Sequence, residues 1–327
     1  MNRGLRKLAN AVRVLGCWAA LASLTGGPTL AQNAETGFNQ ALQAFRAGDR
    51  QKAVTVLEAV LKAYPDHAPS HELLGLSLSA LGENPEALRH LREAVKLWPD
   101  QPVYWINLAI LYLRQSRTDE AEKALKQSLE VEPSAPAFRL LGLIRLDQNW
   151  GEDAVRLFQK ALDLAHDEPE SWYYLGLAQQ SLAHSEEALH CYEEALKRAP
   201  GDFHTQLQMG SLLLSRGQRH QALEHLRVAQ AIRPQDAEVY QRLSEAYLGN
   251  GDLQQALESA RRGADLRPDN CEVHYQLGLV LARLGKSEEA KKEFAISEGL
   301  PKKPETTPLE RWRALLGEAL RNNGPKP

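Results

Sequence analysis

The sequence repeats itself with a period of 34 residues, and this period constrains the fold more than any other feature of the chain. Two columns of residues return eight times each, with a single step of 33 residues among steps of 34. One column holds small residues: Ala41, Gly75, Ala109, Gly142, Gly176, Gly210, Ser244 and Gly278. The other holds alanine: Ala53, Ala87, Ala121, Ala154, Ala188, Ala222, Ala256 and Ala290. A fixed period in this range predicts stacked copies of one supersecondary unit, whose neighbours bury a continuous core.

Each unit contains two segments with the hydrophobic spacing of an amphipathic helix. The first stripe is illustrated by Trp105, Leu108, Ala109 and Tyr112. The second segment opens with capping and acidic residues, as at Ser185-Glu186-Glu187, and stops near a proline, as at Pro200. A turn column between the two segments holds Gly48, Gly82, Gly217, Gly251 and Gly285. The sequence therefore predicts an all-α chain of helix–turn–helix pairs.

Small residues on both helices allow the pair to approach closely, and a large residue four positions after the alanine is expected to fill the gap beside them. That residue is Phe158, Tyr192, Leu226 or Phe294 in four of the units. The pattern resembles the tetratricopeptide repeat family over residues 34–300, as eight repeats. The resemblance implies an α-solenoid, a right-handed superhelix of antiparallel helix pairs with a concave inner face.

The segments that follow the repeats are predicted from composition and periodicity. Residues 301–308 are expected to form a linker, and residues 309–321 an amphipathic helix that caps the exposed apolar face of repeat eight. Residues 322–327 are expected to be a disordered tail.

The first 31 residues have the layout of a secretory signal peptide. They contain four basic residues and no acid, then an apolar run from Val14 to Leu24, and the small-residue site Thr29-Leu30-Ala31. An uncleaved N-terminal anchor and an organelle transit peptide are the alternatives. We expect cleavage after Ala31 and an exported product, periplasmic or secreted.

Removal of this segment lowers the formal net charge from −3 to −7, because four cations and no anions are lost. A mildly acidic chain without a basic stripe argues against nucleic acid, and against direct binding to an anionic membrane after cleavage. The two remaining cysteines, Cys191 and Cys271, lie about two and a half repeats apart, too far for a disulfide.

The sequence contains no recognisable catalytic or metal-binding motif. His67 and His71 have helical metal-ligand spacing, but no third ligand is evident nearby, so they are interpreted as surface and cap residues. We therefore expect no cofactor and no enzymatic activity.

The resemblance implies that positions 5, 9 and 12 of each first helix face the concave groove. The predicted partner-binding residues there are Phe38, Leu42, Ile106, Ile110, Leu113, Arg139, Leu143, Leu146, Tyr173, Leu177, Tyr275 and Leu279. Neighbouring first helices could instead bury these side chains against one another. The leading hypothesis is a scaffold or adaptor that binds a peptide or helix of another polypeptide in this apolar groove. The alternative is a structural protein that forms homo-oligomers through its convex or terminal surfaces.

Overall fold

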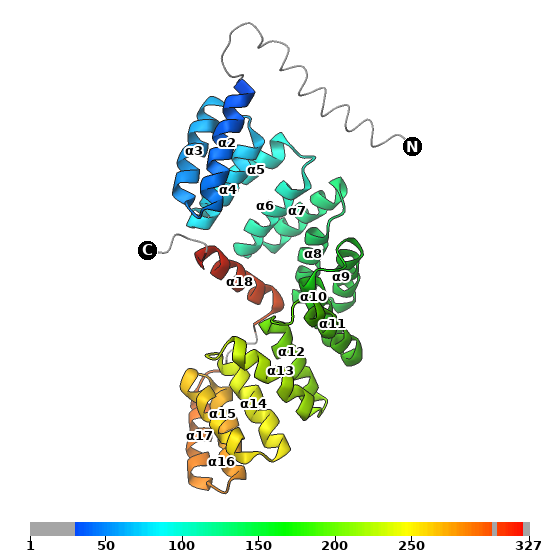
Figure 1. Cartoon of the computed structure of the whole chain (residues 1–327), viewed down its shortest axis with the longest axis vertical. Coiled ribbons are helices and arrows are strands. Elements are labelled where there is room, and N and C mark those ends of the chain that lie inside the picture. Colours follow the sequence, from blue (N-terminus) through cyan, green and yellow to red (C-terminus); the bar gives the residue numbers. More distant parts are fainter. Residues whose placement is uncertain (1–29, 303–305, 323–327) are drawn as a thin grey trace. The chain divides into compact units, whose positions relative to one another are not determined.

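The computed structural model describes residues 30–302 and 306–322 (Figure 1). Most of the predicted signal peptide, part of the predicted linker and the tail from residue 323 lie outside the described residues. All regular secondary structure in the described part is α-helical. None of the described helices combines the length and the apolar content needed to cross a membrane.

The first helices of the eight repeats are α2 (Leu30–Arg46), α4 (Ala68–Leu81), α6 (Pro102–Arg114), α8 (Ala135–Asp147), α10 (Pro169–Ser181), α12 (Phe203–Ser215), α14 (Ala237–Asn250) and α16 (Cys271–Arg283). The second helices are α3 (Arg50–Ala63), α5 (Asn84–Leu97), α7 (Thr118–Val131), α9 (Gly151–Leu164), α11 (Ser185–Arg198), α13 (Arg219–Ile232), α15 (Leu253–Leu266) and α17 (Ser287–Gly299). The last helix is α18 (Pro308–Asn322).

The described chain divides into two compact units, one formed by residues 30–132 with 313–322 and the other by residues 133–302 with 306–312. Within each unit, every first helix packs against the second helix of its own repeat, and that second helix packs against the next first helix. Neighbouring first helices also touch, since α4 contacts both α2 and α6 in one unit and α14 contacts α12 and α16 in the other. This order of packing confirms the predicted solenoid of helix pairs.

The small-residue column marks the closest approach of the paired helices. A Cβ atom added at Gly176 would lie 2.5 Å from the Tyr192 ring, and one at Gly142 would lie 2.6 Å from the Phe158 ring. Tyr192 and Phe158 are fully buried. The large residue therefore occupies the space that the missing side chain leaves, as the sequence predicted.

The turn column adopts left-handed backbone in all eight repeats. The five predicted glycines have φ between 75° and 87°. Ser116, Asn149 and Ala183 complete the column with φ of 58°, 61° and 62°. The turn geometry therefore persists where the sequence lacks glycine, although a side chain there makes the backbone less favourable.

A further column, at position 4 of the first helix, links successive repeats by hydrogen bonds. In six repeats the side chain there bonds to the backbone carbonyl six residues earlier, where the preceding repeat ends. The pairs are His71 with Pro65, Trp105 with Pro99, Trp172 with His166, Gln206 with Pro200, Tyr240 with Pro234 and His274 with Pro268. Residues of four types make the same bond, because the helix position fixes the geometry.

Helix α18 is the last helix of the described chain (Figure 1). Burial raises the pKa of Tyr173, and the nearby charge of Arg311 opposes this rise. Leu309 is 0% exposed. The sequence predicts that this helix caps repeat eight, and that role stays a prediction.

Candidate functional site

In the first unit, α2 and α6 carry the predicted partner-binding residues, with α4 between them. Phe38 and Leu42 on α2 and Ile110 on α6 are partly exposed. The Phe38 ring makes an edge contact with the His67 ring, with 5.9 Å between centroids. Ile106 and Leu113 are buried. The accessible apolar surface of this unit is therefore narrower than the sequence predicts.

A partly buried polar cluster joins α4 to α6. The Asn107 side-chain amide donates to the Glu72 carboxyl at 2.7 Å. Burial raises the pKa of Glu72 to about 7, although the bond from Asn107 opposes the rise. Burial and the nearby Glu72 together raise the pKa of Tyr104 to about 12. The Glu72 carboxyl is therefore partly protonated at neutral pH, and its bond to Asn107 holds two neighbouring repeats in register.

In the second unit, the predicted residues lie on α8, α10 and α16. Leu143 and Leu146 on α8 are buried. Arg139 pairs with Glu168 and lies 3.4 Å from Glu170, so its charge is already neutralised. Tyr173 and Leu177 on α10 and Leu279 on α16 are partly exposed, and Tyr275 is 53% exposed.

Burial thus divides the twelve predicted residues into two groups. Four of them are interior residues: Ile106, Leu113, Leu143 and Leu146. Eight reach the surface: Phe38, Leu42, Ile110, Arg139, Tyr173, Leu177, Tyr275 and Leu279. Neighbouring helices explain the interior group, because α6 contacts α4 and α8 contacts α10. Only the second group is available to a partner, and for these eight the binding role stays a prediction.

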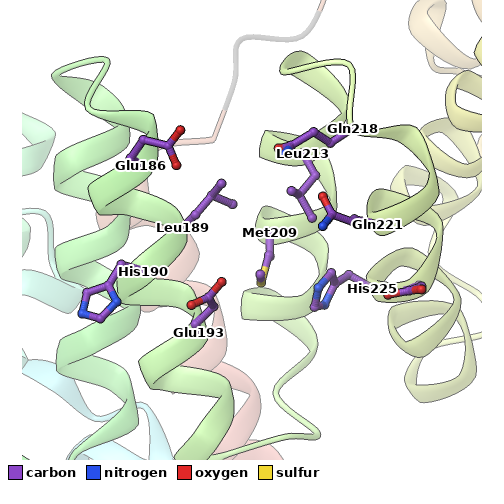
Figure 2. Close-up of a pocket in the computed structure, with 10 residues that line it drawn as sticks. Glu186, Leu189, His190, Glu193, Met209, Leu213, Gln218, Gln221 and His225 are labelled. Carbon is purple, nitrogen blue, oxygen red and sulfur yellow. The ribbon is translucent and has the colours of Figure 1, made fainter.

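A polar pocket that sequence reasoning missed lies between α11, α12 and α13 (Figure 2). Its volume is about 420 Å³. The lining residues are Glu186, Leu189, His190, Glu193, Met209, Leu213, Gln218, Gln221, Glu224 and His225. Figure 2 shows Glu193 on one side and His225 on the other, with Met209 between them. The lining contains three carboxylates and no lysine or arginine, so its electrostatics favour a cation.

Two of the lining side chains already have partners within the protein. Glu186 forms an ion pair with Arg216. His225 Nδ1 lies 2.7 Å from the Gln206 amide oxygen and donates to it, while the same amide donates to the Pro200 carbonyl. Burial lowers the pKa of His225, so the ring is neutral at pH 7.

The sequence interprets His71 as a surface or cap residue, but it is buried, with 7% of its surface exposed. His71 Nε2–H donates to the Pro65 carbonyl at 2.7 Å, which leaves Nδ1 to accept from His90 Nδ1–H at 2.8 Å. Arg89 donates to His90 Nε2 at 2.8 Å. Burial, with the charge of Arg89, lowers the pKa of His90 to about 4. Among the described residues, no group of three His, Cys, Asp or Glu side chains is placed to hold a metal ion.

Both units are thus stacks of helix pairs that expose apolar side chains at fixed positions of the first helices, which defines a helical-repeat protein. The chain belongs to the tetratricopeptide repeat family. Family models described as Tetratricopeptide repeat match residues 38–102, 78–144 and 150–293, and so cover repeats in both units.

Two curated relatives match part of the chain. The N-terminal acetyltransferase A complex auxiliary subunit NAA15 of Arabidopsis thaliana is 25% identical over 136 residues, 41% of this chain and 15% of that protein. The mitochondrial import receptor subunit TOM70 of Rattus norvegicus is 24% identical over 135 residues, 41% of this chain and 22% of that protein. The chain therefore spans less than a quarter of the length of either relative.

Solved structures share the fold at low sequence identity. The structure of pilF from Pseudomonas aeruginosa superposes with a TM-score of 0.58 at 18% identity, and covers 63% of this chain and 94% of that chain. The Cut9–Hcn1 hetero-tetramer of APC/C gives a TM-score of 0.59 at 17% identity, with 93% of this chain and 59% of that chain covered. These likenesses support the fold alone.

Proposed function

We propose that this chain is a non-catalytic scaffold that binds a peptide or helix of another polypeptide along its first helices. The observation that carries the proposal is the recurrence of accessible apolar side chains at equivalent positions in both units: Phe38, Leu42, Ile110, Tyr173, Leu177, Tyr275 and Leu279. Membership of the tetratricopeptide repeat family supports it. So does the similarity to NAA15, which is an auxiliary subunit of a protein complex.

The chemistry of the surface suggests how a partner is held. Aliphatic and aromatic anchors supply most of the binding free energy at such sites, about 2 kcal/mol or more for each dominant residue. Polar groups beside them, such as the paired Arg139, set orientation more than affinity. Because the exposed anchors are uncharged, binding is expected to depend only weakly on salt.

A double substitution tests the proposal in both units at once. Ile110→Asp with Tyr275→Asp places a carboxylate at a surface position of each unit. Val103→Asp, on α6 and 49% exposed, is the matched control because it adds the same charge outside the predicted columns. If the double variant no longer crosslinks partners from an envelope extract while the control still does, the result supports partner binding at this surface. Circular dichroism checks that the double variant is folded. If the folded variant still captures partners at the wild-type level, binding at this surface is excluded.

The alternative function, self-assembly, is favoured by one observation. Val228 and Ile232 on α13 are exposed and four residues apart, so they share one face of a second helix. If this face joins copies of the chain, light scattering after size exclusion will show an oligomer, and Val228→Asp with Ile232→Asp will convert it to a monomer.

We further propose that the chain is exported and that residues 1–31 are its signal. The basic, acid-free start, the apolar run and Thr29-Leu30-Ala31 support this. The mature chain is then expected to begin near Gln32. N-terminal sequencing of the processed protein tests the cleavage, and an intact Met1 on a cytoplasmic product would contradict it.

A further inference from the structure

A guanidinium group without a counter-ion lies beside the accessible apolar surface of the first unit. Arg114 follows Ile110 by one turn on α6, so the two side chains share a face of that helix. The Arg114 side chain is partly exposed, and its Nη1 donates to the Ser79 carbonyl oxygen at 3.2 Å and to the Ser79 hydroxyl. Among the described residues, no carboxylate forms an ion pair with Arg114. Neutral oxygens of α4 therefore hold this cation in place without compensating its charge.

Partial burial distinguishes Arg114 from an ordinary surface arginine. Burial lowers the pKa of Arg114, because removing water from a cation disfavours its charged form. Two partly buried arginines of the second unit have a carboxylate partner, since Arg139 pairs with Glu168 and Arg198 pairs with Glu194 at 2.7 Å. An incoming carboxylate therefore gains more at Arg114 than at an exposed arginine, where water and salt already screen the charge.

Two hydrogen-bonded contacts between α4 and α6 frame the apolar surface next to this cation. The Asn107 amide donates to Glu72 at 2.7 Å. The bond from Arg114 to Ser79 has the same register, because both bonds join residues 35 positions apart. Glu72 and Ser79 are seven residues apart on α4, so the two contacts lie about two helical turns from each other. Ile110 lies between them on α6 and is partly exposed, which gives an apolar surface with one fixed cation at its edge.

The free edge of the Arg114 guanidinium determines the chemistry of its ligand. In the described part of the chain only Nη1 is hydrogen-bonded, so Nε and Nη2 keep their N–H groups for an external acceptor. These two nitrogens form a planar fork that matches the two oxygens of a carboxylate. A phosphate dianion fits less well, since the site offers one cation and the Glu72 carboxyl lies about two turns away. The expected ligand is therefore a carboxylate.

We propose that Arg114 binds a carboxylate of the partner, and that the partner segment on the first unit carries an aspartate or glutamate beside the apolar side chain that contacts Ile110. The inference rests on the proposed function, since it names the partner chemistry of the same surface. On a helical partner the two side chains are three or four residues apart, and on an extended partner they are two apart. The apolar side chain supplies affinity, while the carboxylate sets orientation and excludes segments with a basic residue there. One ion pair adds only a weak dependence on salt.

A phage library of short random peptides tests the proposal with a defined probe. The peptides are fused to the phage coat by their C-termini, so only side-chain carboxylates can be selected. The full chain is the bait, and the peptides scored are those that the wild type keeps and the Ile110→Ala chain releases, because these bind the first unit. They are expected to be enriched in an aspartate or glutamate two to four positions from a large apolar residue.

The same selection is repeated on a chain without the cation. Arg114→Gln removes the charge and keeps an amide that can donate to Ser79. Arg46→Gln is the matched control, because Arg46 has the equivalent position on the first helix of repeat one but is exposed. The acidic preference is expected to disappear for Arg114→Gln and to persist for the control. Circular dichroism checks the fold of each chain. Arg114→Lys is a second variant, which keeps the charge without the fork and is expected to keep a weaker acidic preference.

A double-mutant cycle then locates the contact. One selected peptide is labelled with fluorescein, and its binding is measured by fluorescence anisotropy with the acidic residue kept or replaced by the matching amide. The replacement is expected to weaken binding to the wild type about tenfold and to change binding to the Arg114→Gln chain by less than about twofold. Equal binding of both peptides by the wild type, or the same loss in both chains, would overturn the proposal.

The outcome is separable from that of the proposed function. If the selected peptides depend on Ile110 but show no acidic preference, the scaffold stands and the role of Arg114 is wrong. If the selected peptides depend on Tyr275 alone, partner binding is confined to the second unit and the role of Arg114 is again wrong. If the wild type selects no peptide, both the proposed function and this inference fail.

Discussion

At the scale of single residues, positions that are equivalent in the repeat differ in the strain of their backbone. The turn column requires positive φ in every repeat, and Ala183 adopts it at 62° without the freedom of glycine. Left-handed backbone is unfavourable for a residue with a Cβ by about 1–2 kcal/mol. The three non-glycine turns therefore store strain that the five glycine turns lack.

A reciprocal pair of substitutions measures this strain. Ala183→Gly is expected to raise the free energy of unfolding by about 0.5–1 kcal/mol, because the strain relieved exceeds the added entropy of the unfolded chain. Gly217→Ala is expected to lower it by about 1 kcal/mol through the backbone alone, since a Cβ there meets no heavy atom within 4 Å. Urea melts report both changes, and shifts of the same sign in the two variants would contradict the argument.

Glu72 makes a pH-dependent contribution to stability. Its pKa is about 7 in the folded protein, above the usual value of 4.5, so the folded state holds the proton more tightly than the unfolded state. The stability it contributes is therefore complete below about pH 4.5 and is lost as the pH rises through 7. Glu72→Gln keeps an acceptor for Asn107 without a titrating group.

The Glu72→Gln chain is accordingly expected to become more stable relative to the wild type as the pH rises. Its advantage in the free energy of unfolding should be roughly 1–3 kcal/mol greater at pH 8 than at pH 5. Histidine titrations cancel in this comparison because both chains contain the same histidines. Urea melts at pH 5, 6, 7 and 8 give the difference, and a difference independent of pH would show that the carboxyl titrates normally.

At the scale of helices, caps predicted from one pattern behave differently in the structure. A polar residue follows the proline between repeats by one or two positions, as Asp236 follows Pro234 and Ser134 follows Pro133, and such a residue can cap the next helix. Asp236 accepts from the amides of Glu238 and Val239 and so caps α14. Ser134 occupies the same place before α8, but its side chain makes no capping bond.

Because Asp236 caps its helix and Ser134 does not, replacing each by alanine is expected to reduce stability by different amounts. Asp236→Ala is expected to destabilise the chain by about 0.5–2 kcal/mol, because two helical amides lose their acceptor. Ser134→Ala is expected to stay within about 0.5 kcal/mol. Thermal melts of the two variants compare them directly, and equal losses would mean that the bonds seen at Asp236 contribute nothing.

The helices were predictable because their signals are local and repeated in every unit. The pairing of Gly142 with Phe158 follows from spacing alone, and so does the turn at Gly82. The accessible surface was less predictable, because burial of Leu143 and Leu113 depends on how closely neighbouring first helices approach.

At the scale of the whole molecule, the division into two compact units affects how the chain opens. In a solenoid, each repeat contacts only its neighbours, so stability is nearly a sum of local terms. One unit ends at Glu132 and the next begins at Pro133. A lesion inside one unit should therefore loosen that unit first.

Two matched glycines allow a direct test of this locality. A Cβ at Gly75 would lie 2.7 Å from Leu91 Cγ in the first unit, and a Cβ at Gly210 would lie 2.7 Å from Leu226 Cγ in the second. Gly75→Ala and Gly210→Ala therefore introduce the same clash against the same residue type, at a cost of roughly 1–3 kcal/mol. Hydrogen exchange is expected to accelerate in α2 to α7 for the first variant and in α10 to α15 for the second. If either substitution accelerates exchange equally in both units, the chain unfolds as one cooperative body, and the repeats of the two units do not open independently.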